Sequence, residues 1–192
     1  MATQDSLIPE HKPIAEAPRA LDAIAEQERA NTLPSWNATV AFQLGCALRT
    51  RLLVFEKPTV VHISTISEPG HVLFHAVCKE IDVLRQVTHA GTQLDNTFWI
   101  SRKRKAVIRF GCSTWALHNK FSGDEEAFAK KLGLGATANE YAIHGGGVPI
   151  YVKGCETMVA VVVVSGLKQW DDHQVVVEEL EGVRRGLESG KL

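Results

Sequence analysis

The chain has 192 residues, of which 45% are hydrophobic and 22% are charged, and these proportions predict one globular domain with a substantial core. The formal net charge of −1 excludes a general electrostatic attraction to nucleic acid or to an anionic membrane surface. No apolar run reaches the ~20 residues that a membrane-spanning helix needs, and the first residues lack the basic and then apolar order of a signal peptide. We therefore expect a cytoplasmic protein, with neither nucleic acid nor membrane as a partner.

Residues 1–34 contain four prolines and form an N-terminal extension to a single domain that we expect over residues 35–192. The first dozen residues are expected to be disordered, as chain ends commonly are. The stretch 19–29 is rich in alanine and glutamate and carries a thin apolar stripe, which predicts a helix. We expect this helix to dock on the domain or on a neighbouring subunit.

The first part of the domain alternates between helical and extended patterns. Ser35 is a suitable N-cap for a helix whose apolar residues recur at helical spacing until Pro58 stops it. Residues 59–66 alternate as a strand, and the Glu-Pro-Gly turn at 68–70 leads into a second strand over 71–79. This part of the sequence therefore predicts a β-hairpin. The residues from 81 to 92 have no clean period, and we expect a loop there.

Three helices are predicted next, over 97–110, 114–120 and 125–132. Gly111 ends the first of them, while Ser113 and Asp124 are suitable N-caps for the two short ones. The first helix carries a basic cluster that consists of Arg102, Lys103, Arg104, Lys105 and Arg109. Such a cluster is typical of a solvated helix face or of partners for acidic residues. The alternative is that it binds the propionates or phosphates of a ligand.

The last third of the chain predicts a second hairpin followed by a helix. Residues 148–152 suit a strand start or an edge strand because Pro149 lacks a backbone donor, and Gly154 marks a turn. The β-branched run 158–164 predicts a fully buried strand, and a helix follows from about residue 171. Two hairpins among helices predict an α+β fold, with a mostly antiparallel central sheet flanked by helices.

Four scattered cysteines give little support to a metal site. None of them belongs to a C-x-x-C pair, and each lies in or beside an apolar segment. Their spacing favours buried, reduced thiols over structural zinc. The residues are Cys46, Cys78, Cys112 and Cys155.

His144 precedes three glycines, Gly145, Gly146 and Gly147, at the mouth of the predicted sheet. One interpretation is an imidazole that faces a ligand beside exposed backbone donors, where it would bind a metal, a haem iron or an anion. The other is a histidine that fixes a tight turn by hydrogen bonding. The residues alone leave both interpretations open.

A second group of candidate residues lies where the buried strand ends, at Ser165, Gly166 and His173. His173 near a helix N-terminus would bind a carboxylate or phosphate, or would simply pair with Asp171. A nucleophilic pair of Ser165 with His173 is disfavoured, because the G-x-S-x-G motif is absent.

Three segments resemble the haem-degrading domain family, that is, the GlcG/HbpS-like group and in particular its uncharacterised branch in bacteria and fungi. They are DNTFWISRKRKAVIRFG, YAIHGGGVPIYVKG and VVVVSGLKQWDDHQVVVEEL, in the same order as in the family. The segments Gly146–Ile150 and Val164–Gly166 match positions shared across the wider family. The resemblance covers roughly residues 35–187, and matches to the nearer branch alone include Trp99, Arg102, Lys103, Arg104, His144, Asp172 and His173.

The resemblance implies a profilin-like fold, assembly into dimers and larger rings, and binding of haem or a related tetrapyrrole. It also implies the possibility of haem-degrading activity. In this hypothesis His144 or His173 lies near the iron, and Arg102 or Arg104 lies near the propionates. Apolar contact to the ring comes from groups such as Trp99, Tyr141 or Trp170, while the cofactor carries the chemistry.

Two other functions remain open at this point. The domain could be a non-catalytic, oligomeric scaffold that binds a protein partner through residues 1–34. A smaller possibility is an enzyme for a small carboxylate or phosphorylated metabolite at the turn of Gly145–Gly147.

Overall fold

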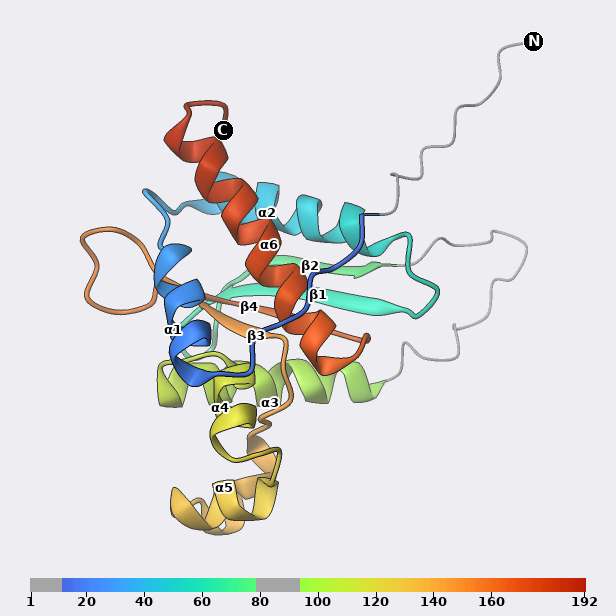
Figure 1. The fold of residues 1–192 in the computed structure, drawn as a ribbon, viewed down its shortest axis with the longest axis vertical. Coiled ribbons are helices and arrows are strands. Elements are labelled where there is room, and N and C mark those ends of the chain that lie inside the picture. The colour runs from blue at the N-terminus through green and yellow to red at the C-terminus, as the bar shows by residue number, and fades with distance from the viewer. Residues whose placement is uncertain (1–11, 79–93) are drawn as a thin grey trace.

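The computed structural model describes residues 12–78 and 94–192, and the loop predicted over 81–92 lies outside these residues. The described part is built on one four-stranded sheet with the strand order β2-β1-β4-β3, and each neighbouring pair is antiparallel (Figure 1). Both predicted hairpins are therefore confirmed. The strands are β1 (Thr59–Thr65), β2 (Val72–Cys78), β3 (Gly147–Ile150) and β4 (Ala160–Ser165).

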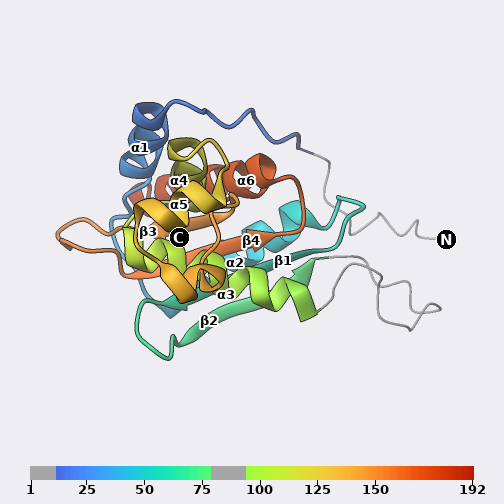
Figure 2. The ribbon, with the colours of Figure 1, turned by 90° about the horizontal axis from the view of Figure 1, so that it is seen from below.

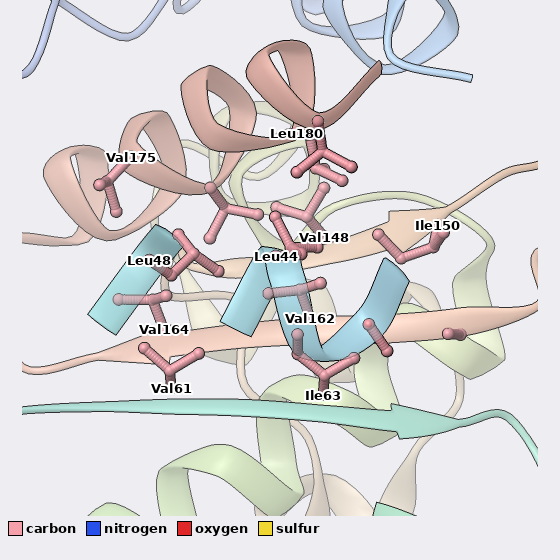
Figure 3. Close-up of a cluster of buried hydrophobic side chains, with 14 of the residues drawn as sticks. Leu44, Leu48, Val61, Ile63, Val148, Ile150, Val162, Val164, Val175 and Leu180 are labelled. Carbon is pink, nitrogen blue, oxygen red and sulfur yellow. The ribbon is translucent and has the colours of Figure 1, made fainter. Parts of the chain in front are cut away.

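Strand β4 lies in the middle of the sheet, and all six of its residues are buried because helices cover both faces (Figure 2). Helices α2 (Ala38–Leu52) and α6 (Gln169–Glu188) pack on one face, where Val162 and Val164 join the larger core (Figure 3). Helix α3 (Leu94–Phe110) packs on the other face, against Val161 and Val163. The predicted α+β architecture with a flanked antiparallel sheet is confirmed.

The start of α2 differs from the prediction. The N-cap is Asn37, whose side chain accepts a hydrogen bond from the Val40 N–H at 2.9 Å, so the prediction of Ser35 is wrong. The chain is still extended at Leu33, which forms an isolated parallel bridge with Val152. This bridge delays the helix, and the next residue with a suitable side chain takes the cap.

Two short helices form an arm that stands away from the sheet (Figure 1). They are α4 (Thr114–Lys120) and α5 (Glu125–Lys131), and a 3-10 turn, η1 (Gly135–Glu140), follows them. The predicted caps are confirmed, since Ser113 accepts from the Ala116 N–H and Asp124 accepts from the Ala127 N–H. Helix α4 also packs against α1, α3, α6 and β3, and its Trp115 is completely buried.

The described part of the extension, residues 12–34, lies on the domain and contains helix α1 (Leu21–Ala30), as predicted from the sequence. Ile24 of α1 is completely buried. Residues 12–18, which precede α1, form an extended segment that we call the strap. Arg51 of α2 holds this strap, because its guanidinium donates to the carbonyl oxygens of Lys12 and Pro13. The division of the chain at residue 34 into extension and domain remains a prediction.

In the described residues all four cysteines are free. Cys78 is buried, but Cys155 is exposed, so the prediction of buried thiols is wrong for that residue, which follows the turn at Gly154. No cluster of three or more metal-binding side chains occurs in these residues. Within residues 12–78 and 94–192, no helix combines the length and apolar character needed to cross a bilayer.

Candidate functional site

A pocket of about 250 Å³ opens where β4 ends and α6 begins. Helix α3 and the turn before β3 complete its wall, so three distant parts of the sequence build it. Four of the predicted site residues line this pocket together. The lining residues are Trp99, Lys103, His144, Ser165, Gly166, Leu167, Gln169 and Asp172.

Lys103 and Asp172 form the floor of the pocket. The Lys103 ammonium, in a residue only 2% exposed, donates to the Val164 carbonyl at 3.0 Å, to Ser165 Oγ at 3.3 Å and to Asp172 Oδ2 at 3.4 Å. The Asp172 carboxylate also accepts the backbone N–H groups of Gly166 and Leu167. The pair therefore ties α3, the exit of β4 and α6 into one unit.

Burial acts on both members of this pair. It raises the pKa of the Asp172 carboxyl, against the opposing effect of the Lys103 charge. It also lowers the pKa of the Lys103 ammonium, against the opposing effect of Asp172. Each group therefore depends on the other to keep its charge in a buried place.

The sequence predicted that the basic cluster is either a solvated helix face or a set of partners for acidic residues. Lys103 and Arg104 are both buried, so a solvated face is wrong for these two residues. Their ion pairs with Asp172 and Glu68 agree with the second alternative. The helical spacing of the sequence already indicated that Lys103 is buried. Lys103 is four residues before Val107 and three after Ile100, and both of these face the core. Asp172 carried no comparable signal, because an aspartate in a first helical turn is usual on dipole grounds alone.

His144 stands at the mouth of the pocket, with 42% of its side chain exposed. Its Nδ1 lies 3.4 Å from the Glu125 carboxylate, which is longer than a good hydrogen bond, and its ring meets Trp99 edge-on with centroids 4.8 Å apart. Burial lowers the pKa of His144, and the charges of Lys103 and Arg102 add to this, while Glu125 opposes it. The imidazole is therefore neutral at neutral pH, as a metal ligand must be.

The three glycines pack the turn closely against the end of β4. Gly146 has a φ of +116°, and a Cβ there would lie 2.2 Å from the Val164 carbonyl oxygen. The N–H of Gly145 donates to Gln169 Oε1 at 3.3 Å, and that of Gly147 donates to Thr114 Oγ1 at 2.9 Å. These two donors are thus bonded within the chain. Pro149 lies inside β3 and does not line the pocket.

The two candidate arginines point in different directions, because residues two apart on a helix lie on opposite sides. The Arg102 guanidinium donates twice to the Tyr141 carbonyl and lies 4.8 Å from the centre of the Trp99 ring, close to the pocket mouth. Arg104 instead holds the turn after β1. Its guanidinium bonds to the Ser64 hydroxyl, the Glu68 carboxylate and the carbonyl oxygens of Thr65 and Ser67.

His173 lies in the core and not at the pocket. It is completely buried near Trp115, and neither ring nitrogen has a hydrogen-bond partner among the described residues. Burial lowers its pKa to about 3. Ser165 has no bond to His173; its hydroxyl is bonded to Lys103 instead.

The family model described as "Haem degrading protein HbpS-like" matches residues 37–181. A UPF0303 protein of Psychromonas ingrahamii is 32% identical over 161 residues, which are 84% of this chain and 91% of that protein. The UPF0303 protein YBR137W of Saccharomyces cerevisiae is 35% identical over 162 residues, which are 83% of this chain and 82% of the yeast protein.

Solved structures agree with this relationship. The crystal structure of Ybr137w matches with a TM-score of 0.74 and 32% identity, over 88% of this chain and 89% of that one. The crystal structure of HbpS matches with a TM-score of 0.52 and 17% identity, over 77% of this chain and 89% of that one. At 17% identity, the second match is informative about the fold alone.

Proposed function

Since the chain belongs to the HbpS-like family of haem degrading proteins, we propose that it binds a tetrapyrrole at the pocket mouth, with His144 as the iron ligand. The arrangement of His144 and Glu125 carries this proposal. Histidines that bind metals commonly direct their second ring nitrogen toward a carboxylate, which fixes the ring and increases its basicity. Glu125 has that position relative to Nδ1 of His144.

The neighbours of His144 support the same proposal. Trp99 offers an aromatic surface beside the imidazole, and the Arg102 guanidinium lies over that indole, where a ligand carboxylate could reach it. Neither His173, which is buried, nor Arg104, whose guanidinium makes four hydrogen bonds to the turn after β1, fits a role in holding haem. The candidate set is therefore reduced to His144, Arg102 and Trp99.

The size of the pocket limits how haem would bind. Pockets that enclose drug-sized ligands measure about 300–1,000 Å³, whereas this one measures about 250 Å³. The interior therefore does not fit the macrocycle, and only the mouth, where His144 is exposed, is available to it. A bound haem would supply oxygen chemistry at its iron, while the chain's own residues would hold it and supply a neutral imidazole.

A haem titration followed by absorbance tests the proposal. We expect a Soret shift that saturates at one haem per chain, that is lost in His144→Ala, and that persists in His71→Ala, an exposed histidine on the hairpin. Glu125→Gln should weaken binding by about 10- to 100-fold, as loss of such a supporting carboxylate commonly does. His173→Gln should bind as the unchanged protein does. An equal shift in His144→Ala would overturn the proposal.

A second candidate is a small polar metabolite inside the pocket, and the small volume and polar floor favour it. The Ser165 hydroxyl, the Gln169 amide and the Lys103–Asp172 pair offer donors and acceptors around a space below haem size. Ligand-observed NMR with a panel of small carboxylates, phosphates and amides would test it. Binding that is reduced by Gln169→Ala and unaffected by haem would favour this candidate, and the absence of binding would exclude it for the panel.

Several expectations from the sequence stay predictions. Self-association into dimers or rings, a cytoplasmic location and a protein partner bound through residues 1–34 each need a direct measurement. For the last of these, the described strap is already engaged, since Arg51 binds two of its carbonyl oxygens and Trp115 Nε1 donates to the Pro18 carbonyl. A partner for the extension would therefore have to use the outer side of the strap or the residues before it.

A further inference from the structure

The arm formed by α4 and α5 carries a hollow of about 760 Å³ that is separate from the pocket described above. It lies between the end of α4 and the end of α5, on the part of the molecule that projects away from the sheet (Figure 1). We call it the lysine-rimmed hollow. It is lined by Lys120, Phe121, Ala127, Lys130, Lys131 and Leu132.

The floor of the hollow is apolar and held in place from below. Phe121 meets Phe128 edge-on, with ring centroids 5.4 Å apart, and Phe128 is only 2% exposed. Leu132 packs on the same buried cluster, which gives the floor a fixed shape. A preformed apolar surface binds a partner side chain at a lower entropic cost than a flexible one.

The rim of the hollow is basic. Lys120, Lys130 and Lys131 are all exposed, and none of them forms an ion pair within residues 12–78 and 94–192. Among the described lysines, Lys105 pairs with Glu140 and Lys153 pairs with Glu188, whereas Lys57, Lys168 and Lys191 lack an ion pair as the rim lysines do. What distinguishes the rim lysines is that three of them border one apolar surface. No carboxylate lines the hollow.

Helix electrostatics explain only part of this arrangement. Each of the three lysines lies in or next to the last turn of its helix, where a cation is favoured. That effect accounts for their positions along α4 and α5. It does not require that both helix ends converge on one apolar surface free of acidic groups.

We propose that the lysine-rimmed hollow docks an acidic segment of a partner protein, with one bulky apolar side chain of that segment on the Phe121–Leu132 floor. Carboxylates on either side of the anchor would pair with the three lysines, and the apolar floor would supply the contact that charge alone does not give. A nucleic acid is a poorer match, because the chain as a whole is near neutral and the rim has only three cations.

Fluorescence anisotropy with the full-length protein tests the proposal. The probe is a labelled synthetic peptide with glutamates around a central Leu-Phe pair, and a peptide with lysine in place of each glutamate is its control. We expect binding of the acidic peptide only, weakening with added salt. The double variant Lys130→Gln, Lys131→Gln should bind about tenfold more weakly, since it removes two of the three cations that would pair with the carboxylates of the peptide. Ala127→Glu, at an exposed helical position in the hollow, should also weaken binding.

The matched control is Lys57→Gln, an exposed lysine in the loop before β1, far from the arm, which should bind as the unchanged protein does. Circular dichroism and the melting temperature should be the same in all variants, because the substituted side chains are exposed. Three results would overturn the proposal: no binding of the acidic peptide, equal weakening by Lys57→Gln, or binding of anionic lipid vesicles in preference to the peptide. A second copy as the occupant, seen as self-association lost in the double variant, would overturn it as well.

Discussion

Lys103 and Asp172 lie 69 residues apart in the sequence, yet Nζ of the lysine and Oδ2 of the aspartate are 3.4 Å apart beneath the pocket. Both side chains are at least 96% buried, so each charge depends mainly on the other and on the hydrogen bonds around the pair. The pair fixes the relative position of α3, which carries Trp99, and of the β4–α6 junction, which carries Ser165. The shape of the pocket thus depends on an interaction outside the residues that a ligand would meet first.

Replacing Lys103 with Met should destabilise the fold by about 3–5 kcal/mol, because the Asp172 carboxylate is left buried without a counter-charge. Asp172→Asn should cost less, since the amide oxygen can still accept the N–H groups of Gly166 and Leu167. In the double variant, Lys103→Met with Asp172→Asn, the loss should be smaller than the sum of the two single losses. Urea unfolding of all four proteins measures this coupling, and simple additivity would contradict it.

The fold could largely be predicted from the sequence because its elements have strong local signals. The run 158–164 is so uniformly β-branched that only a buried strand suits it, and β4 is buried at every position. The caps at Ser113 and Asp124 follow from side-chain chemistry within three residues. Local signals do not report contacts with distant parts of the chain. The Leu33–Val152 bridge is such a contact, and the prediction of Ser35 as the N-cap of α2 was wrong beside it.

The candidate site could be predicted less completely, for the same reason. His144, Ser165 and Gly166 were identified because glycines and a strand exit mark places where side chains gather, and they do line one pocket. Sequence patterns cannot tell which of two histidines near a sheet edge is exposed. The structure separates them, since His144 stands at the mouth and His173 lies in the core.

The lowered pKa of the buried His173 leads us to expect that the protein loses stability in mild acid. Its pKa is about 3 in the folded state, against 6.5 as the ordinary value, because burial disfavours the imidazolium. Below pH 6.5 the unfolded chain takes up a proton that the folded chain does not, so folding weakens by about 1.4 kcal/mol per pH unit until about pH 3. Above pH 7.5 this contribution vanishes. His62, whose pKa burial lowers to about 4, acts in the same direction.

Urea unfolding at pH 7.5 and pH 5.5 measures this dependence. The unchanged protein should be less stable at pH 5.5, and the difference should shrink in His173→Gln, which carries no titratable group at that position. His71→Ala, at an exposed histidine, should keep the full difference. A pH dependence that is the same in His173→Gln and in the unchanged protein would disprove the role assigned to His173.

Gly146→Ala should destabilise the protein by at least about 2 kcal/mol. Its φ of +116° is unfavourable for a residue with a side chain, and the new Cβ would meet the Val164 carbonyl oxygen, which is backbone and cannot easily move away. Gly182→Ala is the matched control, because Gly182 lies in α6 and a Cβ added there would have no atom within 4 Å. That variant should gain up to about 1 kcal/mol from helix propensity. Thermal unfolding of both variants gives the comparison.

Arg51→Met should release the strap over residues 12–18. In the folded chain this guanidinium, in a residue only 7% exposed, bonds to two strap carbonyls and to the carboxylates of Glu178 and Glu179. Methionine keeps much of the apolar stem but none of these bonds, so a loss of about 2–3 kcal/mol is expected. Limited proteolysis should cut the strap faster in this variant than in Arg185→Ala, whose guanidinium is on the exposed side of α6. Equal rates would mean that Trp115 and helix α1 hold the strap without help from Arg51.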